Sequence, residues 1–465
     1  MTDKTINDKA VLILLFAVVV GFFSWIFFES IEFPIDEDAI TTCKPLVDFF
    51  NRSSFVEGYQ ALTSQQAEHR LLPSRLVALL SIFLFDHLNF AFVYMAGGAL
   101  VLAFAWLIYQ DQLKSGTGKP VDLLLYALLI LNPAYRTGTF AIWGVSNFTS
   151  VVFPALAIIQ MHKKNWIGFW LFQLFSFLSL NSQGNGVLVL AMGAFYFLFD
   201  QHGKDYRKLA VHFFISGLML AIYFHRFDTF GYLVIYQRFF EHPFATILFY
   251  CFAIISWLGQ WVLVRDSILH DYIYLGVLIS RFVGISIIIM FGYVWLKNYR
   301  LLLSRYSIRF YIFLYILGTI AGASWDRSLI AAYLQNSTDT LALGFVLDSR
   351  FSFYSICLFL VISSLMFSVA REKMPVSPVG KTARLVTPVL ALALGLLFCS
   401  ARYIDSLPDM EVEKWQQQTC LKMWQQHLED RRPCRRHKEA VDAMKAAEKQ
   451  GWLDIGERSK TGTSQ

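Results

Sequence analysis

The chain has 465 residues, of which 56% are hydrophobic and only 16% are charged, so its composition argues against a soluble globular protein. The 44 Phe, 21 Tyr and 12 Trp residues suit lipid-facing and interfacial surfaces, where aromatic rings are favoured. The formal net charge of +6 does not indicate nucleic-acid binding, because the Lys and Arg residues lie in short loops between apolar runs, where they set membrane orientation. We therefore expect an all-α integral membrane protein.

Apolar runs follow one another along most of the chain, and many approach the length needed to cross roughly 30 Å of hydrocarbon. They predict a bundle of about 11 transmembrane helices. The predicted crossings are Ala10–Phe28, Phe90–Tyr109, Val121–Leu131, Ser146–Met161, Trp166–Leu180, Val187–Phe199, Leu209–Phe224, Gly276–Trp295, Phe310–Ser324, Phe351–Val369 and Val386–Cys399. The first run is too long for the apolar core of a signal peptide, so we expect it to be a permanent anchor.

The basic loops between these runs fix the topology by parity, because Lys and Arg residues are concentrated on the cytoplasmic side. If all these loops are cytoplasmic, an even number of crossings separates each consecutive pair. The interval between Lys208 and Lys297 contains three apolar runs, so one of them, Phe244–Val264, is predicted to be re-entrant or interfacial. This topology places the N-terminus in the cytoplasm and the C-terminus outside.

The last part of the chain differs from the rest because it is charged and lacks long apolar runs. We therefore divide the chain into a polytopic transmembrane domain, residues 1–403, with a first outer loop at 30–89, and a helical hairpin with a tail, residues 404–465. The hairpin could cap a substrate cleft or be a solvated appendage, and both interpretations stay open. Cys420 and Cys434 fall in this outer segment, an oxidising compartment by the topology, so we expect a disulfide between them.

Ionisable side chains gather in the first outer loop, close to the predicted membrane surface. The acidic and basic residues that stand out there are Asp36, Glu37, Asp38, Glu68, His69, Arg70 and Arg75. Further polar residues that the topology brings to the same face are Arg136, Asn147, Asn181, Asn185 and Arg350. A carboxylate can deprotonate an acceptor hydroxyl, and Arg side chains suit bidentate contact with phosphate. Glycosyl transfer from a lipid-linked phosphosugar requires this combination.

Each motif also has an ordinary structural interpretation. The triplet Asp36–Asp38 can be a solvated turn, and Glu68 can simply favour the positive end of an interfacial helix. The turn Asn181–Gly186 can be a tight hairpin that requires glycine geometry. The convergence of the motifs on one membrane face, rather than any single motif, favours the functional interpretation.

Several short stretches resemble bacterial polytopic glycosyltransferases built on the GT-C plan. They are Asp36-Glu37-Asp38 after the first span, Ala67-Glu68-His69-Arg70, Ser179–Gly186 between two spans, and Ser349-Arg350-Phe351 at the mouth of a late span. Members of the group usually show a double Asp before Trp, Asn-Glu-His-Arg and Ser-Arg-Tyr, where this chain has Ala39, Ala67 and Phe351. The resemblance covers nearly the whole chain in layout.

The resemblance implies a transferase that uses a polyprenyl-phosphate sugar at the outer face of a bacterial inner membrane. The acceptor in such proteins is commonly a surface polysaccharide such as the O-antigen of lipopolysaccharide. We expect membrane lipid as the surroundings, and no cofactor, metal or nucleic acid as a partner.

The resemblance also divides the first loop into a base end and a phosphate end. The base is implied to be Asp36, with Asp38 as the alternative and Glu37 between them. The residues implied to hold or support the donor phosphate are Glu68, His69, Arg70, Arg75 and Arg350. The residues expected to line the substrate cleft are Arg136, Asn147, Asn181 and Asn185.

Other functional classes stay open at this point. A transporter or flippase for a lipid-linked sugar would also need many spans, but related halves or broken helices would be expected, and the sequence has no convincing internal repeat. An O-antigen polymerase or ligase typically concentrates its Arg and His residues in a late outer loop, whereas here the richest loop comes first. A structural or interaction role is the third possibility.

Overall fold

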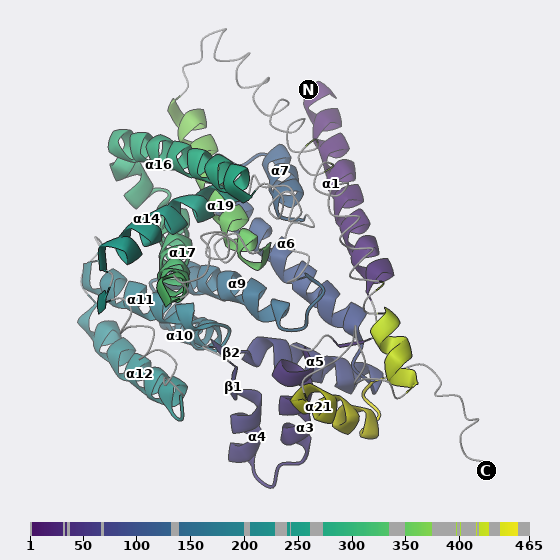
Figure 1. Ribbon diagram of the computed structural model, residues 1–465. Coiled ribbons are helices and arrows are strands. Elements are labelled where there is room, and N and C mark those ends of the chain that lie inside the picture. The colour runs from purple at the N-terminus through teal and green to yellow at the C-terminus, as the bar shows by residue number, and fades with distance from the viewer. Residues whose placement is uncertain are drawn as a thin grey trace, which may run out of the picture.

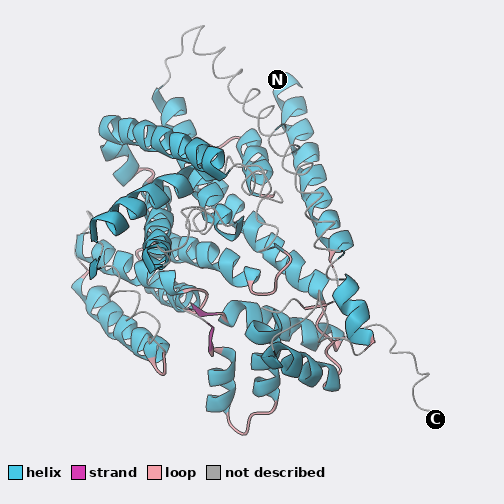
Figure 2. Ribbon diagram, viewed as in Figure 1, coloured by secondary structure: helices cyan, strands magenta, loops and turns pink. Residues whose placement is uncertain are grey.

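The computed structural model is built almost entirely of helices, with one short antiparallel hairpin (Figures 1 and 2). The structure describes residues 2–30, 33–34, 38–66, 69–131, 139–199, 205–227, 240–241, 243–260, 273–333, 349–373, 397, 400, 415, 418–426 and 438–453. The elements of the first third are α1 (Thr2–Glu29), the π-helix η1 (Ala39–Cys43), α3 (Lys44–Phe50), α4 (Phe55–Leu62), β1 (Gln65–Gln66), β2 (His69–Arg70), α5 (Leu72–Phe85), α6 (Phe90–Lys114) and α7 (Pro120–Ile130). The later elements are α9 (Gly144–Met161), α10 (Trp166–Leu180), η3 (Gly184–Gly186), α11 (Val187–Phe199), α12 (Tyr206–Phe224), α14 (Pro243–Gly259), α16 (Ile273–Ser304), α17 (Ser307–Tyr333), α19 (Ser349–Lys373) and α21 (Lys438–Lys449).

Within the described residues, 7 helices are long and apolar enough to cross a membrane, which confirms an all-α membrane fold. These segments are Asp8–Glu29, Phe90–Lys114, Gly144–Met161, Tyr206–Phe224, Leu275–Ser304, Ser307–Trp325 and Ser352–Glu372. The helices α7, α10 and α11 coincide with predicted crossings but have only 11, 15 and 13 residues. The last predicted crossing, Val386–Cys399, lies outside the described residues apart from Leu397.

Polar caps mark where several of these helices begin. The side chain of Asn89 accepts a hydrogen bond from Phe92 N at 2.7 Å at the start of α6. Asn165 caps α10 in the same way, and Asp205 caps α12 through Lys208 N at 3.1 Å. Such caps satisfy backbone N–H groups that would otherwise lack a partner at a helix start.

The basic loops gather at one end of the bundle, held by buried ion pairs. Arg309, at the start of α17, is fully buried and donates to Asp111 Oδ2 at 2.8 Å and to Ser115 Oγ at 3.0 Å at the end of α6. Arg371, at the end of α19, donates to both carboxylate oxygens of Asp122 in the first turn of α7. The loops around residues 114–119, 305–309 and 371–373 therefore share one face, as the parity argument requires.

Two further basic loops join the same end. Lys208 Nζ donates to the carbonyl of Lys164 at 2.7 Å, which ties the start of α12 to the loop before α10. The ring of His162, next to that loop, lies 5.5 Å from the ring of Tyr311 on α17.

Helix α1 runs beside α6 and α7 along one edge of the molecule (Figure 1).

The first outer loop and the C-terminal segment pack together at the other end, where Figure 1 shows α3, α4, α5 and α21. Leu88 N donates to Trp452 O at 2.7 Å, and the indole of Trp452 lies 4.7 Å from the ring of Phe50. Lys44 and Glu439 form an ion pair at 2.5 Å between α3 and α21. Helix α21 is therefore packed against α3 and η1 and is not a solvated appendage.

Cys420 is disulfide-bonded, as expected for an outer segment in an oxidising compartment. Among the described residues, Cys43, Cys251 and Cys357 are free thiols. Cys434 lies outside the described residues. The pairing of Cys420 with Cys434 stays a prediction.

Helix α14 runs from the surface into the interior of the bundle, against α16, α17 and α19. Its exposed fraction falls from 89% at Phe244 to 1% at Trp257. It crosses α16 at a glycine contact, where a Cβ on Gly259 or Gly284 would lie 1.9 Å from a backbone oxygen of the other helix. Only glycine permits two helix backbones to approach this closely.

Candidate functional site

Asp38 anchors the acidic end of the first loop to the loop before α9. Its carboxyl group is fully buried, and Oδ1 accepts hydrogen bonds from Ile142 N at 2.8 Å and Trp143 N at 3.4 Å. The segment that follows Asp38 begins η1 directly. Its neighbours Asp36 and Glu37 lie outside the described residues.

Arg75, in the first turn of α5, forms hydrogen bonds in the interior of the first loop. Its fully buried guanidinium donates to the carbonyls of Thr41 at 2.8 Å, Leu62 at 2.9 Å and Ser64 at 2.8 Å. Among the described residues, Nη2 has no hydrogen-bond partner and no carboxylate pairs with the side chain. Burial lowers the pKa of Arg75 to about 9, and the positive charge of Arg70 adds to this effect.

Arg70, on β2, joins the first loop to the end of α12. It donates to the carbonyls of Tyr223 at 2.9 Å and His225 at 2.8 Å, and also to the carbonyl of Thr63. Burial lowers the pKa of Arg70, while the nearby hydroxyls of Tyr223 and Tyr59 raise it. The guanidinium also lies over the ring of Tyr223, 5.5 Å from its centroid. Neither carbonyl dipoles nor an aromatic ring neutralise the charge, so it keeps its attraction for an anion.

The sequence neighbours of Arg70 are less fully described. His69 pairs with Gln66 across the short β1–β2 hairpin, where the ordinary structural interpretation of the sequence was the start of an interfacial helix. Glu68 lies outside the described residues.

The start of α5 is hydrogen-bonded to the end of α10 and to the start of α9. Leu72 N donates to Asn181 O at 3.1 Å, at the end of α10. The hydroxyl of Ser74 lies 2.6 Å from that of Ser146, at the start of α9. Pro73 suits the first turn, where its missing N–H costs nothing. These bonds bring the predicted residue Asn181 to the same end as Asp38 and Arg75.

A buried chain of hydrogen bonds continues from Asn147 into the bundle. Gln183 Nε2 donates to Asn147 Oδ1, and Tyr354 on α19 donates to Gln183 Oε1 at 2.7 Å. The Tyr354 hydroxyl also lies 2.7 Å from Ser150 Oγ, and Tyr315 on α17 donates to the Ser150 carbonyl at 2.7 Å. Sequence reasoning singled out Asn147 and the turn that holds Gln183, but it missed Ser150, Tyr315 and Tyr354 because isolated hydroxyls within apolar runs carry no distinct pattern.

The remaining predicted cleft residues are only partly placed. Asn185 Nδ2 donates to Thr319 Oγ1 at 3.3 Å, and within the part of the chain described here its Oδ1 is buried without a partner. Arg136 lies outside the described residues, and Arg350 is placed in the first turn of α19 with its side chain outside them.

A polar pocket of about 490 Å³ opens between α4, the β1–β2 hairpin and the end of α12. Its polar lining residues are Tyr59, Gln60, Thr63, Ser64, Gln65, Arg70, His225 and Arg226. None of the described lining residues is acidic, so the lining favours an anion. Arg226 has a left-handed backbone, with φ of 56°, and its Nη1 reaches Gln60 Oε1 at 3.5 Å. Neither His225 nor Arg226 was singled out in the sequence, because both follow the predicted span without any motif.

The described residues therefore bring Asp38, Arg70, Arg75, Asn147 and Asn181 to one end of the bundle. Within the described ranges, no group of three His, Cys, Asp or Glu residues is placed to hold a metal ion. No protein family, no curated protein and no solved structure matches the chain.

Proposed function

We propose that the chain is a membrane glycosyltransferase of the GT-C plan. It would move a sugar from polyprenyl phosphate to a cell-surface acceptor at the outer face of a bacterial inner membrane. The observation that carries the proposal is a pocket that Arg70 of the first loop lines together with Arg226 and without a described carboxylate. Asp38 and Arg75 fix the same loop through hydrogen bonds to backbone groups.

The proposed topology keeps the 11 crossings, with the N-terminus in the cytoplasm and the C-terminus in the periplasm. In it α14 is re-entrant and enters from the outer side. The fall in exposure along α14 supports this assignment, as does the contact of its Tyr250 with Trp325 near the far end of α17, at 5.3 Å between ring centroids. A re-entrant segment does not cross the membrane. With α14 re-entrant, an even number of crossings separates the basic loop at Lys208 from the basic loop at Lys297, as the parity argument requires.

We assign the base to Asp36 and a positioning role to Asp38. A general base must come within about 2.6–3.2 Å of the hydroxyl that it deprotonates. Asp38 is fully buried and its Oδ1 already accepts from two backbone N–H groups, which suits a residue that fixes the loop. Asp36 stands two residues earlier in the sequence.

In the proposed reaction Asp36 takes the proton of the acceptor hydroxyl, whose oxygen attacks the anomeric carbon of the donor. The bond from this carbon to the phosphate oxygen breaks, and the lipid phosphate leaves with the electron pair. Arg70 and Arg226 would stabilise that charge. Arg70 uses three of the five N–H donors of a guanidinium for carbonyls, and Arg226 is exposed beside the pocket.

The proposal can be tested by incubating membranes that contain the full chain with a panel of radiolabelled polyprenyl-phosphate hexoses. The measured quantity is the rate at which the labelled sugar leaves the lipid donor. Asp36→Asn should lower transfer about 10²–10⁴-fold, the usual loss for a general base. Asp38→Asn should retain most activity, because the amide oxygen still accepts the bonds from Ile142 and Trp143.

Two results would contradict the proposal. Normal transfer by Asp36→Asn, with wild-type expression, would remove the assigned base. Failure of the wild-type chain to consume any donor in the panel, in membranes where a control transferase is active, would remove the reaction.

A further inference from the structure

Two stretches of the C-terminal segment, residues 418–426 and 438–453, pack on the first outer loop, and we call them the C-terminal clamp. Figure 1 shows both stretches near α3 and the end of α1. In the first stretch Trp424 is 2% exposed, and its ring lies 6.3 Å from the ring of Phe33, which is fully buried. Phe33 stands between the end of α1 and Asp36 in the sequence. The first stretch therefore covers the start of the first loop.

The second stretch covers the residues that follow Asp38. On α21 the side chains of Ala440, Met444 and Ala447 share one face and are buried. This helix packs against η1 and α3. The π-helix η1 begins directly after Asp38 and ends at Cys43, which is 1% exposed. The clamp therefore contacts the first loop on both sides of the acidic triplet in the sequence.

A disulfide fixes the first stretch of the clamp. Cys420 is disulfide-bonded and stands four residues before Trp424, so the two side chains lie on the same face of one helix. Helices shorter than about 12 residues are marginal by themselves in water, and this one is described over residues 418–425. Its position therefore depends on packing and on the covalent link. Trp424 belongs to the same hydrophobic cluster as Met444 of α21 and Cys43 of η1, so the two stretches form one packed unit.

We propose that the Cys420 disulfide is a redox-sensitive switch that keeps the C-terminal clamp on the first loop. In the reducing step a dithiol becomes a disulfide, while Cys420 and its partner become thiols. The helix then loses its covalent link, Trp424 withdraws from Phe33, and the cover over η1 opens. Asp36 stands between Phe33 and η1 in the sequence, so this opening would also lower sugar transfer. That consequence rests on the proposed function, whereas the switch itself does not.

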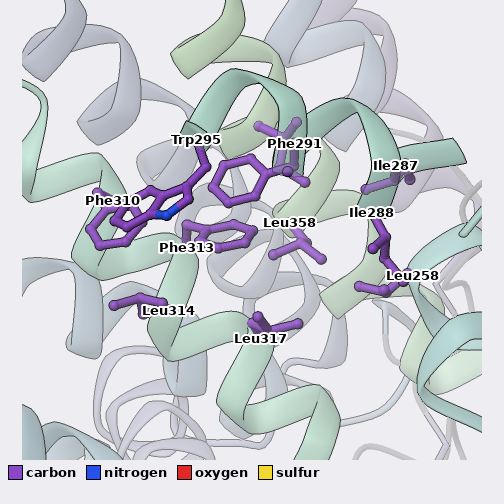
Figure 3. Close-up of a pocket in the computed structure, with 12 residues that line it drawn as sticks. Leu258, Ile287, Ile288, Phe291, Trp295, Phe310, Phe313, Leu314, Leu317 and Leu358 are labelled. Carbon is purple, nitrogen blue, oxygen red and sulfur yellow. The ribbon is translucent and has the colours of Figure 1, made fainter. Parts of the chain in front are cut away.

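Two native thiols report on the switch. Cys43 is buried in η1 under the clamp, so its reaction with N-ethylmaleimide measures how often the clamp opens. Cys357 on α19 is a reference thiol in the interior of the bundle, where it is fully buried. The next residue, Leu358, lines an apolar pocket of about 370 Å³ between α16 and α17, as Figure 3 shows. Cys357 should therefore stay protected while the clamp opens.

The test is alkylation of the purified full-length protein with N-ethylmaleimide, followed at each cysteine by peptide mass spectrometry. We expect Trp424→Ala and Cys420→Ser each to raise the alkylation rate of Cys43 about tenfold or more. Trp415→Ala is the matched control for the first variant, because Trp415 precedes Trp424 in the same segment and is 60% exposed. Cys251→Ser is the control for the second, because Cys251 is an exposed thiol on α14. Both controls should alkylate Cys43 at the wild-type rate.

The wild-type protein tests the switch without any substitution. After treatment with dithiothreitol and desalting, its Cys43 should react as fast as in Cys420→Ser. A Cys43 that stays protected in both samples would overturn the role of the disulfide. Equal rates in Trp424→Ala and Trp415→Ala would overturn the contact with Phe33, and exposure of Cys357 together with Cys43 would overturn a local opening. Alkylation needs no lipid donor, so a chain without transfer activity gives the same test.

Discussion

Asp38, Arg70 and Arg75 of the first loop all form hydrogen bonds with backbone groups. Asp38 accepts from N–H groups 104 and 105 positions away, and Arg70 donates to carbonyls 153 and 155 positions away. The sequence indicated which residues gather at the outer end, because polarity beside an apolar run is visible in the pattern. It could not indicate their partners, because backbone groups are the same at every position and only the fold selects among them.

Arg75 gives a prediction at this scale. Arg75→Met would leave buried carbonyls of Thr41, Leu62 and Ser64 without their donor, and each unsatisfied group costs about 1–3 kcal/mol. We expect a clear fall in the midpoint of thermal unfolding in detergent. Arg52→Met is the control, because Arg52 is exposed and bonds only the carbonyl of Phe49, so its loss should stay within about 1 kcal/mol. Equal midpoints of thermal unfolding for the two variants would show that the hydrogen bonds of Arg75 do not stabilise the first loop.

At the scale of elements, apolar periodicity located the long helices well. The predicted runs Trp166–Leu180 and Val187–Phe199 coincide with α10 and α11. The helices of the first outer loop were not predicted, because η1, α3 and α4 are short and are stabilised mainly by packing on α5 and α21. The glycines at the α14–α16 crossing also gave no signal, since glycine is frequent in membrane helices for several reasons.

The crossing of α14 and α16 gives a prediction at this scale. Gly284→Ala forces a Cβ to within 1.9 Å of the Ile255 carbonyl oxygen, so the helices must separate at a cost of about 1–3 kcal/mol. Gly322→Ala on α17 is the control, because its Cβ meets nothing within 4 Å and removing a helical glycine stabilises by about 0.5–1 kcal/mol. Thermal unfolding should shift in opposite directions. A Gly284→Ala midpoint equal to or above that of the control would contradict the close crossing.

At the scale of the whole molecule, the C-terminal segment closes back on the first outer loop. The ion pair between Lys44 and Glu439 joins residues 395 positions apart. The sequence left open whether this segment packs or is solvated, because an amphipathic helix shows which face is apolar and not what covers it. The hydrogen bond from Leu88 N to the Trp452 carbonyl completes the contact.

This contact should depend on pH. The hydrogen bond and charge of Lys44 lower the pKa of Glu439 from its usual 4.5, so the pair adds stability above about pH 4.5 and loses it as the pH falls through the lowered pKa. Limited proteolysis should cut the segment around α21 faster at pH 3.5 than at pH 7. Lys44→Gln should make the rates at the two pH values more alike. An unchanged pH dependence in Lys44→Gln would assign the effect to other groups.

The two buried ion pairs among the basic loops restrict how the helices that they join can move relative to one another. Each pair would leave an unpaired buried charge if it were broken, at a cost of about 3–5 kcal/mol. The pairs are Arg309 with Asp111 and Arg371 with Asp122. Rocking of two halves, as alternating access requires, would have to break these pairs in every cycle. The end with the basic loops therefore acts as a fixed frame, and in the proposed transferase reaction substrate would have to enter and leave at the opposite end.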